Sequence, residues 1–368
     1  MKSLLKNTKI DWYIPILTVI LALLGLLFIW SASTYSALKN YSDPLFFVKK
    51  QALAFAVGIV CMSVVASINL GFLKKYKWVC LAVGYILLAL VFIPGLGVES
   101  YGAKRWINLY VFSMQPSEVS KFLLMIFLAG FMDKYPIDKP LNFAVGLFLG
   151  GAMCLLIMLE PNMSVTVCLL LSVLIMLCVG GAKIKYFIIL SIPLLVAFVL
   201  LIALEPYRMK RIAAFIDPWS SPKGEGYQLI QSLYALSRGG WFGVGIGNSG
   251  QKYLFLPFAE SDFILSVIGE ETGLVGVILL MSIYLLLIIR GFKAAKNAGT
   301  RFDCYLASGI TAVLTCQTLI NLAVVSGSIP PTGIPLPFIS FGGSSLVAFM
   351  TASGILINVS KTRAINIS

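Results

Sequence analysis

Residues Pro257–Glu271 read Pro-Phe-Ala-Glu-Ser-Asp-Phe-Ile-Leu-Ser-Val-Ile-Gly-Glu-Glu and join a long polar segment to an apolar helix of about twenty residues. One carboxylate, Asp262, stands where the two meet, and Glu270 and Glu271 follow inside the predicted helix. Ionisable side chains are costly inside a membrane, and where they occur they mark functional positions. This stretch therefore predicts a membrane protein with a reactive group at the boundary of the bilayer.

Composition supports the membrane class for the whole chain. Hydrophobic residues make up 59% of it and charged residues only 12%, whereas a soluble domain carries about 25% charged residues. Apolar runs near or above the roughly 18 residues that span a bilayer recur throughout, and the alternating pattern of a β-barrel is absent. We predict an all-α polytopic membrane protein with about ten transmembrane helices, at 12–33, 46–68, 78–97, 114–132, 141–159, 163–181, 185–204, 262–290, 303–326 and 340–360.

The distribution of charge predicts the orientation of these helices. With a cytoplasmic N-terminus, more than half of the 28 lysines and arginines fall in short inner segments, and most of the 15 acidic residues fall outside or in the membrane. We therefore predict that both termini are cytoplasmic. The net charge of +13 is explained by this asymmetry, so no nucleic-acid partner is expected.

Two residue types limit the possible chemistry. The seven cysteines lie in or beside apolar segments without a Cys-x-x-Cys pair, which argues against a disulfide framework. Histidine is absent, so a general base must be a carboxylate, a lysine or a tyrosine, and a histidine-ligated zinc site is excluded.

Asp262 is the candidate for that base. Its apolar flanks would raise its pKa toward working pH, although a carboxylate beside Ser261 at a helix start could equally be a helix cap. Glu270 and Glu271 would lie some 12 Å deeper along the helix, beyond the roughly 5–9.5 Å of a glycosidase carboxylate pair. We interpret them as structural partners of lysine, arginine or backbone donors.

Basic residues in the outer segment 94–116 and the helix that follows form the candidate anion site. Lys104, Arg105 and Lys121 together could bind a diphosphate. Trp106 and Glu118 are predicted to belong to the same substrate site. Interfacial snorkelling is the alternative for Lys104 and Arg105, and Trp106 could be an interfacial aromatic. Lys121, inside an apolar helix, is expected to pair with Glu118 or with a substrate anion.

Irregular segments surround these candidates. Gln115, Pro116 and Ser344 are predicted to support the site, with Pro116 at the first position of a helix. The outer loop, about 205–261, lies between predicted helices 7 and 8, and its glycine-rich tract at 239–250 is expected to fold tightly onto the membrane surface. The Pro- and Gly-rich segment 328–345, before the tenth helix, cannot be helical, so we expect a re-entrant or capping segment over a polar cavity.

The chain resembles the SEDS family (FtsW, RodA, SpoVE) over essentially its whole length, as one transmembrane domain covering residues 1–368. The resemblance rests on segments in the family's order, and 226–252 is most similar to the FtsW and SpoVE branch. These segments are 102–107 with 115–121, Glu160-Pro161, 226–252 leading into 257–273, and 331–345. The resemblance implies ten spans in the bacterial cytoplasmic membrane, an essential aspartate at Asp262, and sensitive basic positions at Arg105 and Lys121.

The resemblance also implies peptidoglycan glycosyltransferase activity on lipid II during cell division or sporulation. The implied partners are a class B penicillin-binding protein and other divisome proteins. A divalent cation, Mg or Mn, is an open possibility, and the metal ligands are unknown. Two alternatives remain at this stage: a lipid II flippase, and a non-enzymatic scaffold for the transpeptidase.

Overall fold

The computed structural model describes residues 6–7, 10–100, 103–108, 113–203, 206–253 and 255–363. Each predicted span falls on a helix: α1 (Tyr13–Tyr41), α2 (Phe46–Ser67), α4 (Lys77–Leu90), α5 (Pro116–Lys134), α6 (Pro140–Leu159), α7 (Met163–Val179), α8 (Ile184–Ala203), α11 (Ile264–Lys296), α12 (Arg301–Val325) and α13 (Gly343–Lys361). Within the described ranges, α1, α2, α6, α11, α12 and α13 are long and apolar enough to cross a membrane. The chain is an all-helical polytopic membrane protein, as predicted.

Several predicted helix ends are wrong for identifiable reasons. Helix α1 continues past the predicted end at residue 33 to Tyr41 and ends there because Ser42 has a left-handed backbone (φ 55°). Helix α4 stops at Leu90 rather than at 97, ahead of Pro94. Helix α11 starts at Ile264 and runs to Lys296, so Asp262 precedes the helix.

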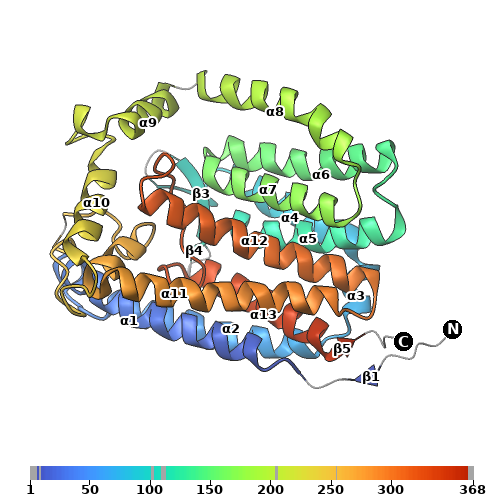
Figure 1. Ribbon diagram of the computed structural model, residues 1–368, viewed down its shortest axis with the longest axis horizontal. Helices are drawn as coiled ribbons and strands as arrows, with labels where there is room; N and C mark the ends of the chain where they lie inside the picture. The colour runs from blue at the N-terminus through green and yellow to red at the C-terminus, as the bar shows by residue number, and fades with distance from the viewer. Residues whose placement is uncertain are drawn as a thin grey trace.

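Helices α5, α12 and α13 form the centre of the bundle. Nearly every residue of α5 from Pro116 to Met132 is buried, and α12 and α13 are buried along most of their length. Helix α13 packs on α2, α4 packs on α5, and α12 packs on α5, α7 and α11. Figure 1 shows these long helices running roughly parallel, with α8 along the upper edge of the bundle.

Short strands, which the sequence did not predict, lie at both ends of the molecule. At one end, β1 (Lys6–Asn7) pairs antiparallel with β5 (Thr362–Arg363), so the two ends of the described chain meet there. At the other end, β2 (Gly97–Ser100), β3 (Ala103–Asn108) and β4 (Ser113–Met114) form an antiparallel sheet in the segment that we predicted to be an irregular outer connection. This sheet carries Arg105.

The long segment between α8 and α11 is more helical than predicted. It contains α9 (Pro206–Ile216), a 3₁₀ turn η1 (Pro218–Ser220) and α10 (Tyr227–Gly239). One further short helix, α3 (Leu70–Lys75), lies between α2 and α4. The glycine-rich tract after α10 packs on α11 itself, since Val244 N and Gly245 N donate to the carbonyls of Glu270 and Glu271. The tract therefore packs tightly on α11, while Trp241, Phe242 and Ile246 keep exposed side chains, and its contact with the membrane surface stays a prediction.

The Pro- and Gly-rich segment before α13 is non-helical, and its second half is largely buried in the protein. Ile334, Leu336, Phe338 and Ile339 are all buried, and Tyr284 of α11 donates a hydrogen bond to the carbonyl of Pro337. Irregular backbone at membrane depth requires such protein partners. The polar cavity beneath the segment stays a prediction.

Candidate active site

Asp262 lies in the turn immediately before α11. Its Oδ1 accepts a hydrogen bond from the Ser261 hydroxyl at 3.0 Å, and its carbonyl accepts one from Asn321 Nδ2 at 3.0 Å. No described residue donates a hydrogen bond to Oδ2, and the side chain is half-buried. The helix-cap alternative is wrong, because the N-cap residue of α11 is Phe263 and no side chain caps this end. One carboxylate oxygen is held and the other is available.

The Pro- and Gly-rich segment packs directly against this turn. Ser340 Oγ donates to the carbonyl of Ser261 at 2.7 Å, and Phe341 N donates to the carbonyl of Glu260 at 2.8 Å. Gln317 and Asn321, one turn apart on α12, donate to the carbonyls of Pro335 and Ile334 at 2.9 and 2.8 Å. The position of Asp262 is therefore fixed by two elements from the last part of the chain.

The surroundings of Asp262 change its acidity in two directions. Burial raises the pKa of Asp262 and is the largest influence on it. The hydrogen bond from Ser261 and the positive charges of Arg105 and Arg211 lower the pKa. Because burial dominates, this carboxylate holds a proton more readily than an ordinary aspartate, as a general base must.

Arg105 extends from β3 to the turn between α6 and α7. Its Nε donates to the carbonyl of Glu160 at 3.1 Å, and its Nη2 donates to the carbonyl of Pro161. The Glu160 side chain is buried, and its carboxylate oxygens make no hydrogen bond among the described residues. Burial raises the pKa of Glu160 to about 8, against the opposing charge of Arg105. The Glu160-Pro161 pair thus anchors the arginine.

The other predicted anion-binding residues are placed differently. Trp106 is half-buried on β3, where it pairs with Val98 of β2. Lys104 lies on the same strand, and its side chain is outside the described residues. Lys121 is only 1% exposed, and its Nζ contacts Glu118 Oε2 at 2.9 Å and Gln317 Oε1 at 2.6 Å. The structure thus has Lys121 paired with Glu118, and its contact with a substrate anion stays a prediction.

The residues predicted to support the site lie around this ion pair. Pro116 is the first residue of α5, as its sequence context predicts. Gln115 N donates to Ser344 Oγ at 3.3 Å, and the adjacent Ser345 hydroxyl donates to Glu118 Oε2 at 2.6 Å. The start of α5 is thus tied to the start of α13.

Glu270 and Glu271 hold the glycine-rich tract against α11. Glu270 is fully buried and accepts hydrogen bonds from Arg238, from the Ser249 hydroxyl, and from the backbone N–H groups of Gly250 and Gln251. Glu271 accepts hydrogen bonds from Ser31 of α1 and from Ser249 N. Two residues further on, Gly273 has a φ of 67° inside α11, where the tract crosses the helix. These contacts are with an arginine, hydroxyls and backbone donors.

The described residues do not supply a preformed site for a divalent cation. They contain no group of three histidine, cysteine, aspartate or glutamate side chains that could hold a metal ion together. Mg²⁺ and Mn²⁺ prefer several oxygen ligands in a compact arrangement. We therefore derive no step through a metal, and cation dependence stays a question for the assay.

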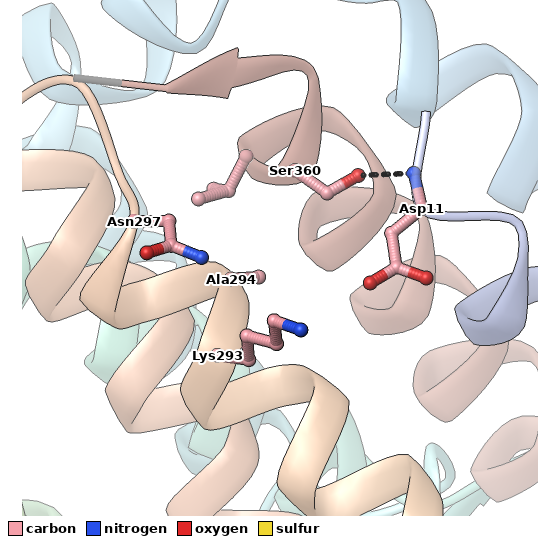
Figure 2. A pocket seen from close by; sticks show the side chains of 6 residues that line it. Asp11, Lys293, Ala294, Asn297 and Ser360 are labelled. Atoms are coloured by element: carbon pink, nitrogen blue, oxygen red, sulfur yellow. Dashed lines mark hydrogen bonds between the residues drawn. The ribbon is translucent and has the colours of Figure 1, made fainter. Parts of the chain in front are cut away.

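A small pocket lies at the opposite end of α11. Figure 2 shows it between the end of α11 and the end of α13, lined by Asp11, Lys293, Ala294, Asn297, Val359 and Ser360. Asp262 precedes the first turn of α11 and Lys293 lies in the last turn, so this helix separates them by roughly 45 Å at 1.5 Å per residue. The pocket is therefore remote from the candidate active site.

The structure adds residues that the sequence did not single out. Arg211 of α9 contributes positive charge at Asp262, and Gln317 and Asn321 fix the segment that packs on it. Gly333 comes so close that a Cβ atom there would lie 2.9 Å from Asp262 Oδ2. The available signal for Gln317 and Asn321 was a pair of amide side chains one helical turn apart within a predicted span.

The sequence profile of the cell cycle protein family, which represents FtsW, RodA and SpoVE, matches residues 11–365. The chain belongs to this family. Among its members, stage V sporulation protein E of Bacillus subtilis (strain 168) is 36% identical over 363 residues, 97% of this chain and 98% of that protein. The probable peptidoglycan glycosyltransferase FtsW of Geobacter sp. (strain M18) is 38% identical over 354 residues, 95% and 96% of the two chains.

Solved structures of the FtsW, RodA and SpoVE family have the same fold. A chain from the structure described as "Structural coordination of polymerization and crosslinking by a peptidoglycan synthase complex" has a TM-score of 0.80 and 28% identity, and the match covers 95% of this chain and 97% of that one. The rod shape determining protein RodA of Thermus thermophilus has a TM-score of 0.71 and 25% identity, with 95% and 96% covered. The family predicted from the sequence is thereby confirmed.

Proposed function

We propose that this chain polymerises lipid II into glycan strands at the outer face of the bacterial cytoplasmic membrane, with Asp262 as the general base. The enzyme class is that of its family: the chain is a peptidoglycan glycosyltransferase, similar over nearly its full length to relatives of that name. The observation that carries the assignment of Asp262 is geometric. It has one oxygen held by Ser261, the other without a hydrogen bond from the described residues, and the charges of two arginines close by.

The proposed reaction is a single displacement. Asp262 Oδ2 takes the proton from the 4-hydroxyl of the acceptor sugar as that oxygen attacks the anomeric carbon of the donor chain. The bond from that carbon to the diphosphate oxygen breaks, and undecaprenyl diphosphate leaves with the electron pair. A positioned general base contributes about 10²- to 10⁴-fold to such a step.

The two arginines whose charges act on Asp262 are suited to bind the leaving group. Guanidinium groups bind diphosphate oxygens in a bidentate manner, and Arg105 and Arg211 both exert their charge at Asp262. Arg105 is held by the carbonyls of Glu160 and Pro161, so its side chain loses less conformational entropy when substrate binds. Lys104 and Lys121 are proposed as further contacts, and Lys121 would first have to leave its pair with Glu118.

The proposed membrane arrangement has ten spans and both termini in the cytoplasm. It is supported by the helices found at each predicted span and by the pairing of β1 with β5, which brings both ends of the described chain to one side. The candidate active site then lies at the outer side. We propose a class B penicillin-binding protein and other divisome proteins as partners, since a structural relative belongs to a peptidoglycan synthase complex.

Polymerisation of purified lipid II by the purified protein tests the assignment, with and without the transpeptidase partner. We expect Asp262→Ala to abolish glycan product, and Asp217→Ala, which removes an exposed carboxylate from the same outer segment, to leave it intact. Full activity of Asp262→Ala would overturn the proposal. Lipid translocation in sealed vesicles without glycan product would instead indicate a flippase, and tolerance of Asp262→Asn would indicate a scaffold.

The same assay decides the cation question. Chelator added to the wild-type enzyme should stop the reaction if Mg²⁺ or Mn²⁺ bridges the substrate diphosphate. Readdition of each cation then identifies which one supports turnover. Unchanged activity in chelator would remove the cation from the mechanism.

A further inference from the structure

Gly333 occupies an unusual position in the segment between α12 and α13. It is exposed, while Pro331 and Ile334 on either side of it are buried. A Cβ atom built on Gly333 would lie 2.9 Å from Asp262 Oδ2 and 3.8 Å from its Cγ. The backbone at Gly333 therefore borders the oxygen of the Asp262 carboxylate to which no described residue donates a hydrogen bond.

The distance between Gly333 and Asp262 is fixed by anchors on both sides. Asn321 Nδ2 donates to the carbonyl of Asp262 at 3.0 Å and to that of Ile334 at 2.8 Å, so one side chain binds both segments. On the other side of Gly333, Arg211 Nη1 donates to the carbonyl of Pro331 at 3.3 Å. Neither segment can move away from the other without breaking one of these hydrogen bonds.

The carboxylate is also limited in how it can turn. Its Oδ1 accepts the 3.0 Å hydrogen bond from the Ser261 hydroxyl, and rotation of the carboxylate plane away from position 333 would lengthen that bond. A carbon atom 2.9 Å from Oδ2 is closer than ordinary van der Waals contact allows. A side chain at position 333 would thus displace the carboxylate or anything bound to Oδ2.

We propose that Gly333 is a positioning residue of the acceptor site, whose missing side chain leaves the volume beside Oδ2 that the acceptor hydroxyl occupies. The inference rests on the proposed function. A general base must lie about 2.6–3.2 Å from the oxygen whose proton it takes. The Cβ atom of any larger residue would lie 2.9 Å from Oδ2, within that range, and would take up the space on this side of the oxygen.

Gly333→Ala is the direct test, in the full-length protein with purified lipid II. We expect kcat to fall by about 10- to 100-fold, because a misplacement of about 1 Å at the reacting atoms has effects of this size. We also expect the acidic limb of the kcat/KM profile to move to higher pH, because a methyl group beside Oδ2 excludes water and disfavours the charged carboxylate. A purely structural role for Gly333 would not move that limb.

Gly342→Ala is the matched control in the same segment. Its Cβ atom would meet only Ser345 Cβ, at 3.6 Å, which is ordinary contact, so we expect wild-type activity and an unchanged pH profile. Wild-type activity and pH dependence in Gly333→Ala would overturn the inference. The proposed function fails separately, if wild-type protein makes no glycan or Asp262→Ala remains active.

A double-mutant cycle on unfolding temperature tests the geometry without any activity measurement. We expect Gly333→Ala to lower the unfolding temperature when Asp262 is present, because the new methyl group crowds the carboxylate. In the Asp262→Ala background the same substitution should not lower the unfolding temperature, since the oxygen it would meet is gone. Equal losses in the two backgrounds would overturn the inference, even for a variant that is too unstable to assay.

Discussion

Asp262 and Glu270 are carboxylates eight residues apart at the start of the same long helix, yet their surroundings are opposite. Glu270 is fully buried and accepts hydrogen bonds at both oxygens, from one arginine, one serine and two backbone N–H groups. Asp262 is half-buried, with Oδ1 bound to Ser261 and no donor to Oδ2 among the described residues. Both oxygens of Glu270 thus accept hydrogen bonds from within the protein, whereas Asp262 retains one oxygen that can accept a hydrogen bond from a bound substrate.

The comparison separates two uses of charge in a membrane protein. A buried carboxylate with four donors stabilises a particular backbone arrangement, here the glycine-rich tract on α11. A carboxylate left partly unpaired is less favourable for stability and is retained where chemistry needs it. The two residues should therefore differ in what is lost on mutation: activity for Asp262 and stability for Glu270.

The largest expected effect is loss of activity in Asp262→Asn. The amide has the same shape but cannot take a proton, so polymerisation should fall by about 10²- to 10⁴-fold. The unfolding temperature at neutral pH should stay equal or rise, because the raised pKa means that the charged carboxylate is disfavoured in the folded protein. Glycan product on gels and thermal unfolding in detergent measure the two. A large loss of stability would remove the contrast with Glu270.

The second effect is destabilisation by Glu270→Ala. Removal of this side chain leaves the N–H groups of Gly250 and Gln251 without their acceptor, together with the Ser249 hydroxyl. We expect a loss of about 3 kcal/mol, typical of breaking a buried, charge-assisted group of hydrogen bonds. Differential thermal unfolding of the purified variant measures the loss.

Arg238→Ala is the control for the ion pair within that group. The Arg238 side chain is 56% exposed, so its contact with Glu270 is screened by solvent and should contribute less than about 1 kcal/mol. An equal loss in Arg238→Ala and Glu270→Ala would show that the ion pair, and not the backbone donors, explains the stability.

The helices of the fold could be predicted from the sequence because hydrophobic length is a local property. Every predicted span is helical, and Pro116 begins its helix where predicted. The sheet that carries Arg105 was missed because its strands are short and pair only with one another. The helices of the outer segment were missed because α9 and α10 are short and neither is an apolar run long enough to be predicted as a span.

The candidate site was predictable only in part. Asp262 stands out because an acidic residue beside an apolar run is rare. Gly333 and Arg211 could not be found this way, since their importance comes from contacts between segments distant in sequence. The pairing of Lys121 with Glu118 was one of two predicted alternatives, but its contact with Gln317 was not predicted, because Gln317 lies on another helix.

The pH dependence of the wild-type enzyme offers a finer comparison. The base must be unprotonated, so kcat/KM should fall as pH is lowered through a pKa above the roughly 3.9 of an ordinary aspartate. Stability should move the other way: the folded state holds this proton more tightly than the unfolded state, so stability is lost as pH rises through the same window. Asp262→Asn should abolish this component of the stability profile. An acidic limb at or below the ordinary value would contradict the raised pKa.

The smallest expected effect is that of Arg211→Gln on the same acidic limb. The charge of Arg211 lowers the pKa of Asp262, so its removal should move the limb to higher pH by a few tenths of a unit. The shift should be small because the Arg211 side chain is 45% exposed, and it should shrink further in high salt. Lys210→Gln removes the same charge from the adjacent residue, which does not contribute to the pKa of Asp262, and should leave the limb in place. Equal shifts in the two variants would mean that the pKa of Asp262 depends on the net charge of α9, and not on the position of Arg211 at the carbonyl of Pro331.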